Sequence, residues 1–177
     1  MAELHTLSVL TLDEPGILVH IAGMFSRRGF SIQSITSGTT EVEGVNRITL
    51  VVETENLPIE QITKQLNKLV PVLKVVRQPD DQLVSRALLL VKVTADNNNR
   101  PQVVDAAKLF RARVVDVAQE SVVIEATGER SKLRALLEVL EPFGIRELVQ
   151  SGTVAVARGP KPMLASRALS PPKQSPG

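Results

Sequence analysis

Hydrophobic and polar positions change their spacing along the chain in a regular order. In segments 5–12 and 45–53, apolar residues alternate with polar ones or form short aliphatic runs, which is typical of β-strands with a buried face. Between these segments Ile17, Ile21 and Phe25 recur at helical spacing. In the first half, the pattern predicts strands over 5–12, 30–36, 45–53 and 72–77 and helices over 16–28 and 58–69.

The same order of elements starts again after a short polar linker, residues 78–82. The helix ends before Pro71 and Pro142 also look alike, but chance explains such a likeness between helices that stop before proline about as well as duplication does. The repeated βαββαβ order is the stronger evidence for a duplicated unit. The second half is predicted to hold strands over 86–94, 113–117, 121–126, 145–149 and 153–157, one helix that ends at Phe110 and another over 130–140.

Each βαββαβ unit fits a four-stranded antiparallel sheet with two helices on one face. The sequence thus predicts an α+β protein of two tandem ferredoxin-like units, over residues 1–78 and 83–159. A basic tail rich in proline and serine, residues 160–177, is expected to be disordered. The strands are too apolar to leave both a face and an edge in water, so we expect the sheets to pair edge to edge with another copy.

Composition argues against nucleic-acid binding. The four phenylalanines are the only aromatic residues, so the chain lacks the rings on which single-stranded nucleic acids stack. The net charge is +2, but the four basic residues after residue 157 have no acidic residue among them. Without them 17 basic residues face 19 acidic ones, a net charge of −2, so the folded part is slightly acidic.

The chain has no cysteine, and therefore no disulfide. We expect no signal peptide, because the first strand is predicted to start almost at once, and no apolar run approaches the ~20 residues that a membrane span needs. Enzyme and metal signatures are also missing. His5 and His20, the only histidines, have no second ligand three or four residues away, and both are expected to be solvated. We therefore expect a cytoplasmic protein without membrane contact, catalytic residues or a metal site.

The D-E-P-G turn at residues 13–16, between the first strand and the first helix, is the main candidate site. Asp13 is expected to cap the helix, and Pro15 to lie in its first turn. The backbone at Gly16, Ile17 and Leu18 is then bare at a helix N-terminus, where free N–H groups can hold a carboxylate. A lone loop of this kind is most often a plain helix cap.

Neighbouring residues favour a more specific interpretation of this turn. Asp13 can accept a ligand ammonium group, and Ser31 and Gln33 are expected beside the same turn as further polar contacts. The aliphatic surroundings favour a branched side chain. Together these features predict a site for a small zwitterionic amino acid that is held at both ends.

At these residues the chain resembles a known family. The run LSVLTLDEPGILVHIAGMFSRRGFSIQSIT is similar to the ACT domain of the regulatory small subunits of acetolactate (acetohydroxyacid) synthase. The likeness continues through ITKQLNKLVPVLKV and, in the second half, through LFRARVVDVAQESVVIEATG and LEPFGIRELVQSGTVAVARG. It covers roughly residues 6–159 and extends well beyond the general ACT pattern of a strand, D-x-P-G and a helix.

The resemblance implies a non-catalytic subunit in branched-chain amino-acid biosynthesis. In this family the large catalytic subunit carries thiamine diphosphate, Mg²⁺ and FAD and makes 2-acetolactate or 2-aceto-2-hydroxybutyrate, so this chain would need no cofactor of its own. The small subunit raises the activity of the large one and confers feedback inhibition, typically by valine. The implied partners are the large subunit, a second copy joined through the ACT domains, and the amino-acid effector.

The implied valine site lies where two ACT domains meet. Family members commonly have Asn at the position of Ser31. Losing a hydrogen bond to a charged ligand costs ~1.5–3 kcal/mol, roughly 10- to 150-fold in affinity, so feedback sensitivity is expected to be weak or altered. One chain would supply Asp13, Gly16, Ile17 and Leu18, and the other Ser31 and Ile32, with Gln33 beside them.

Two other functions stay open on the sequence alone. A stand-alone ACT-domain sensor of amino acids that acts on a different partner would carry the same site. Co-purification with a thiamine-dependent, FAD-containing partner would distinguish it from the regulatory subunit. A small enzyme on the same fold would need a set of reactive side chains that the motifs do not supply, and turnover of pyruvate by the isolated chain would reveal it.

Overall fold

The computed structural model describes residues 3–54 and 58–163 of the 177-residue chain. The chain forms two compact units, one from Met1–Leu83 with Val156–Gly177 and the other from Val84–Ala155. No helix within the described ranges is long and apolar enough to cross a membrane. Each unit is described by itself below.

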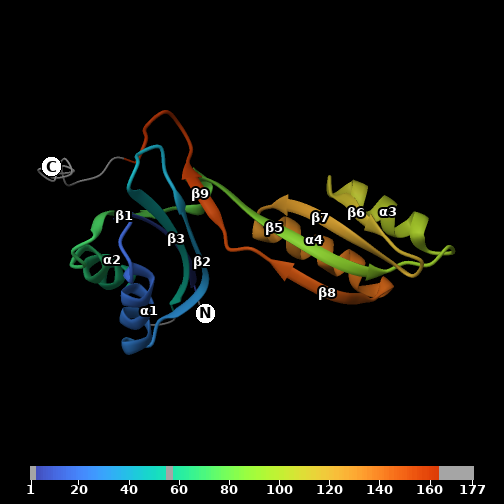
Figure 1. Cartoon of the computed structure of the whole chain (residues 1–177), viewed down its shortest axis with the longest axis horizontal. Helices are drawn as coiled ribbons and strands as arrows, with labels where there is room; N and C mark the ends of the chain where they lie inside the picture. The colour runs from blue at the N-terminus through green and yellow to red at the C-terminus, as the bar shows by residue number, and fades with distance from the viewer. Residues whose placement is uncertain (1–2, 55–57, 164–177) are drawn as a thin grey trace, which may run out of the picture. The chain divides into compact units, whose positions relative to one another are not determined.

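The first unit is an antiparallel sheet with two helices on one face. Its elements are β1 (Glu3–Leu12), α1 (Ile17–Arg27), β2 (Ser31–Thr39), β3 (Val45–Thr54), α2 (Ile59–Asn67) and β4 (Val72–Gln78). The strands lie side by side in the order β2-β3-β1-β4, and Figure 1 shows α1 and α2 together on one side of them. β1 and β3 pair along their whole length, from Glu3 with Thr54 to Leu12 with Val45.

Alternate residues of these strands face the helices and form the core of the first unit. Leu7 of β1 and Leu50 of β3 are fully enclosed, together with Ile21 from α1, and Phe25 is 1% exposed. The helix presents this face because its apolar residues recur every three or four positions. The chain leaves α1 through Gly29, whose φ of 69° is the left-handed conformation common just beyond a helix end.

The second unit repeats this plan. Its elements are β5 (Leu83–Thr94), α3 (Arg100–Leu109), β6 (Arg113–Val117), β7 (Ser121–Gly128), α4 (Arg130–Leu140) and β8 (Ile145–Gln150), followed by a short strand, β9 (Val154–Ala157). The strand order is β6-β7-β5-β8, and β9 also pairs with β5. Leu89 and Val91 of β5 and Leu133 and Leu136 of α4 are fully buried between the sheet and its helices.

The predicted fold class is confirmed, because both units have the βαββαβ order with antiparallel sheets and helices on one face. The bounds of the elements differ by a few residues. β5 begins at Leu83 rather than at residue 86, since a single 3₁₀ turn, Asp80–Gln82, is enough to redirect the chain after β4. The domain limits at residues 78, 83 and 159 stay predictions.

One expectation about a polar residue is wrong. His5, expected to be solvated, is 7% exposed, and its Nε2 lies 3.0 Å from Thr54 Oγ1 on the neighbouring strand. It is buried because β1 is a central strand with a partner on either side. Residues 160–163, which we predicted to belong to the disordered tail, lie against the first sheet, where Met163 packs on an apolar cluster. The rest of the predicted tail, residues 164–177, lies outside the described residues.

Candidate functional site

The D-E-P-G turn connects the end of β1 to the start of α1. The Asp13 N–H donates to the Gly44 carbonyl oxygen at 2.9 Å, which ties the start of the turn to the residue before β3. Gly16 is the N-cap residue of α1 and has φ of 85° and ψ of −3°. This left-handed conformation is strained for residues with a Cβ atom, which explains why glycine occupies the position.

Asp13 does not cap the helix, so that prediction is wrong. Its Oδ1 accepts a hydrogen bond of 2.9 Å from Asn46 Nδ2, at the start of β3. Asn46 pairs with Thr11, two residues before Asp13, and so it reaches the carboxylate from the adjacent strand. Pro15 lies before the helix rather than in its first turn, because α1 begins at Ile17.

The first turn of α1 is consequently open. No side chain makes a capping hydrogen bond to it, and no acidic residue lies in it. The first N–H groups of a helix have no partner within the helix, and the helix dipole places about half a positive charge there. Leu18 and Val19 stand beside these groups with 42% and 72% of their surface exposed. The end of the helix thus combines bare N–H donors with apolar surface.

The corresponding loop of the second unit is closed by its own side chains. Asp96 Oδ1 accepts hydrogen bonds from the N–H groups of Asn98 and Asn99 at 2.8 and 3.0 Å. Asn99 Oδ1 in turn accepts one from the Asp96 N–H at 2.8 Å. The N–H groups of Asn98 and Asn99 are therefore occupied, although α3, like α1, begins without a side-chain cap.

Within one chain, the predicted site residues Ser31, Ile32 and Gln33 lie far from the turn at residues 13–16. Ser31 pairs with Glu53, which in turn pairs with Leu4, so β2 begins at the sheet end where β1 begins. The loop follows Leu12, at the opposite end. Nine residues of β2 span about 26 Å at strand rise. The expectation that Ser31 and Gln33 lie beside the turn in the same chain is therefore wrong.

Ser31, Ile32 and Gln33 have different surroundings. Gln33 Nε2 donates to Glu53 Oε2, and it lies 3.5 Å from Ser31 Oγ, so these polar groups form a small exposed cluster. Ile32 is half-buried and packs against the core of its own unit. All three lie at the start of β2, which is an edge strand with one side unpaired in the sheet order.

Sequence reasoning missed Asn46. Its position in V-N-R, at the start of a strand, reads as an ordinary polar residue after a turn, and only the register of β3 against β1 reveals its role. Within residues 3–54 and 58–163, no group of three His, Asp or Glu side chains is placed to hold a metal ion. The turn at residues 13–16 itself offers helix N–H donors, a fixed carboxylate and apolar side chains.

Comparisons with known proteins give a consistent result for both units. Residues 7–74 match the family described as AHAS small subunit-like ACT domain, and residues 86–159 match the family described as small subunit of acetolactate synthase. The chain is 58% identical over 157 residues to the acetolactate synthase small subunit of Mycobacterium bovis, covering 89% of this chain and 94% of that protein. It is 56% identical over 163 residues to the acetolactate synthase small subunit of Mycolicibacterium smegmatis, covering 92% of this chain and 96% of that protein.

A solved structure agrees with these relatives. The crystal structure of the acetolactate synthase small subunit from Thermotoga maritima matches with a TM-score of 0.81 at 36% identity, over 90% of this chain and 99% of that one. The agreement extends through both units, in sequence and in fold. The chain therefore belongs to the family of acetolactate synthase small subunits, with an ACT domain as its first unit.

Proposed function

We propose that this chain is the regulatory subunit that activates the large catalytic subunit of acetolactate synthase and makes it sensitive to feedback inhibition by valine. One observation carries the proposal: α1 starts without a side-chain cap directly behind Gly16, and Asp13 is fixed beside it by Asn46. Membership in the small-subunit family supports the assignment of the large subunit as the partner. The open helix end supports the binding of a small ligand.

The loop offers complementary groups to the two ends of an amino acid. The N–H groups of the first turn of α1 suit a carboxylate. One oxygen of Asp13 is used by Asn46, and the other is left to accept a hydrogen bond from an ammonium group. Leu18 and Val19 provide exposed apolar surface for a branched side chain. A valine zwitterion meets all three requirements.

A second copy of the chain completes the site through the free edge of β2. Two edge strands that pair antiparallel about a two-fold axis bring opposite ends of the strand together. With the axis at Ile35, the middle of β2, Ser31 of a second copy lies opposite Thr39. Thr39 pairs with Asn46, so the incoming Ser31 lies about 10 Å, two strand spacings, from β3.

This arrangement accounts for the two groups of site residues at opposite ends of the sheet of one chain. Asp13, Gly16, Ile17 and Leu18 come from one copy, and Ser31, Ile32 and Gln33 come from the other. Valine then lies between the copies and stabilises their association. We assign thiamine diphosphate, Mg²⁺ and FAD to the large subunit, and the complex to the cytoplasm.

Reconstitution with the purified large subunit tests this function. The rate of acetolactate formation is measured with the large subunit alone, with this chain added, and with this chain and valine. We expect the chain to raise the rate and valine to lower it only when the chain is present. No increase in rate would contradict the assignment. Stable capture of an unrelated partner in place of the large subunit would favour the stand-alone sensor.

A further inference from the structure

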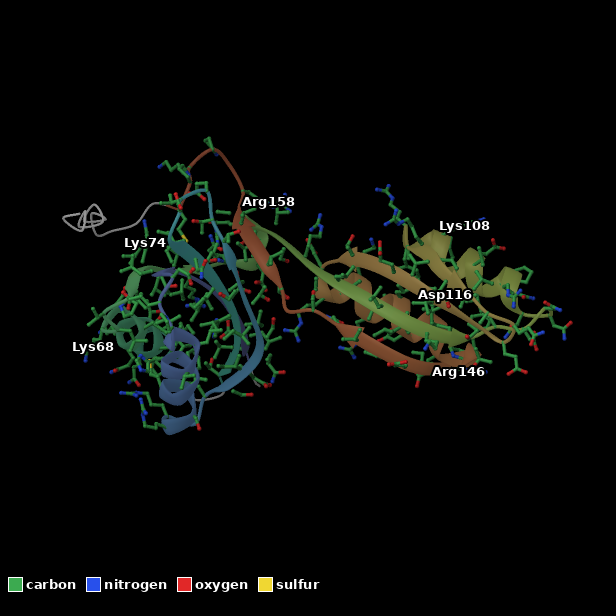
Figure 2. All side chains as sticks on the ribbon, in the orientation of Figure 1. Lys68, Lys74, Lys108, Asp116, Arg146 and Arg158 are labelled. Carbon is green, nitrogen blue, oxygen red and sulfur yellow. The ribbon has the colours of Figure 1, made fainter. Side chains whose placement is uncertain are left out.

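After β9 the chain returns to the first unit. Residues 156–163 group with the first unit, and the Arg158 N–H donates to the Gln82 carbonyl oxygen at 2.8 Å. We call residues 158–163 the strap. Figure 2 labels Arg158, where the strap begins, and in Figure 1 the strap is the red loop that follows β9 and lies beside the turn between β2 and β3.

The strap lies on the sheet face opposite α1 and α2. Met163 packs against an apolar cluster of Leu10, Val45 and Leu73, each at most 6% exposed. Residues Gly159–Met163 also line a pocket of about 280 Å³ together with Leu10, Arg47 and Gln78 of the sheet. The strap therefore covers a face that a ferredoxin-like sheet would otherwise leave open.

Polar groups of the sheet form a hydrogen-bonded set beneath the strap. Arg47 Nη2 donates to Ser8 Oγ at 3.0 Å, and Ser8 Oγ donates to Gln78 Oε1 at 3.1 Å. Ser8 is fully buried. Burial lowers the pKa of the Arg47 guanidinium, and the nearby Glu41 carboxylate offsets part of that effect. A charged side chain is thus held partly away from water on the face that the strap covers.

The residues that Met163 packs against adjoin the turn at residues 13–16. Val45 pairs with Leu12, which also packs against the apolar cluster and immediately precedes Asp13. Val45 also precedes Asn46, the residue that fixes the Asp13 carboxylate. Met163 and Asp13 therefore depend on the same end of β1 and β3, from opposite faces of the sheet.

We propose that docking of the strap stabilises the effector site, the turn at residues 13–16. Its docking fixes the ends of β1 and β3 that position the loop at residues 13–16, and it follows directly on β9, which pairs with β5. The identity of the ligand rests on the proposed function, whereas the effect on the loop does not. Coupling free energies are reciprocal. Docking of the strap therefore raises effector affinity by the same factor by which effector binding raises the equilibrium constant for strap docking.

Amide hydrogen exchange of the full-length chain tests the coupling without a ligand. Met163→Asp places a charge on the apolar cluster, and Val70→Asp, at a residue 81% exposed in the same unit, is the matched control. We expect Met163→Asp to accelerate exchange at Leu12, Asp13 and Asn46 at least tenfold, and Met163→Leu and Val70→Asp to leave it within twofold. Unchanged exchange in Met163→Asp, or an equal change in Val70→Asp, would overturn the proposal.

Valine supplies the reciprocal measurement. When valine saturates the wild-type chain, we expect slower exchange at the strap amides of Gly159, Lys161 and Met163. We also expect Met163→Asp to bind valine more weakly, by the same factor by which valine slows exchange at the strap. Valine binding without protection of the strap would refute the coupling and leave the proposed function intact. Absence of any valine binding would refute the proposed function, and the exchange of Met163→Asp without ligand would still decide about the strap.

Discussion

Asn46 Nδ2 donates a hydrogen bond of 2.9 Å to Asp13 Oδ1, joining the start of β3 to the turn after β1. This contact frees the N-terminus of α1, because the carboxylate that was expected to cap the helix points to the neighbouring strand instead. It also fixes one oxygen of Asp13, so that the other is oriented before a ligand arrives. Asn46 is therefore a positioning residue for the proposed effector site.

Replacing Asn46 by Ala removes the donor that holds Asp13. A hydrogen bond contributes about 0.5–1.5 kcal/mol, so we expect valine affinity to fall about 2- to 10-fold. Calorimetric titration measures the change. Asn67→Ala is the matched control, because the Asn67 amide bonds only within α2, to the Thr63 carbonyl oxygen. Equal affinities of the two variants would show that Asn46 does not position Asp13 for the ligand.

Ser31→Asn tests the contribution of the second copy. Asn adds an amide donor and a longer reach, and a hydrogen bond to a charged ligand contributes ~1.5–3 kcal/mol. We expect valine affinity to rise at least about 10-fold. Ser131→Asn, at an exposed residue of α4 in the second unit, is expected to change nothing. A gain in Ser131→Asn alone, or no gain in Ser31→Asn, would place the site elsewhere.

The free edge of β2 provides a prediction about association. Ile35 is 41% exposed at the middle of the strand, where the proposed two-fold axis lies. Ile35→Lys brings two like charges together at that axis, and directly opposed like charges destabilise a strand pair. Sedimentation equilibrium should show dimers that dissociate at least 10-fold more readily than those of wild type or Val70→Lys. A wild-type chain that stays monomeric would rule out pairing through β2.

The loop of the second unit is expected to be structural. Arg100 Nη2 donates to the carbonyl oxygens of Ala118 and Gln119 at 2.7 and 2.9 Å, so Arg100→Ala removes hydrogen bonds made by a charged group. We expect the free energy of unfolding of this unit to fall by about 1.5–3 kcal/mol, measured by urea titration. Valine affinity should stay unchanged, as in the exposed control Arg130→Ala. Weakened valine binding in Arg100→Ala would give the second loop a role that its geometry does not support.

Much of the fold was predictable from hydrophobic spacing. The strands around Leu7 and Leu50 and the helix through Ile21 and Phe25 follow from periodicities of two and 3.6 residues, because each element buries one face. The turn at residues 13–16 was recognisable from its glycine and its place between strand and helix. That β2 starts far from this turn also follows from topology, since β1 and β2 both pair antiparallel with β3 and so run parallel.

The contacts that depend on register and on distant segments were not predictable. The bond from Asn46 to Asp13 requires the alignment of β3 with β1, to which the sequence around Asn46 gives no signal. The return of Met163 to the first sheet brings it against Val45, which is 118 positions away in the sequence, with no periodic pattern in the strap. Both contacts concern the end of the sheet that carries the proposed site.

Calorimetric titration of valine into the wild-type chain, Gly16→Asp and Gly16→Ala tests the central claim most directly. Both variants carry a Cβ at a φ of 85°, where the structure leaves open space, but only Asp places a carboxylate where the ligand carboxylate would lie. We predict saturable binding to the wild type, a modest loss in Gly16→Ala and no detectable binding to Gly16→Asp. Valine binding by Gly16→Asp with wild-type affinity would contradict an effector site at the N-terminus of α1.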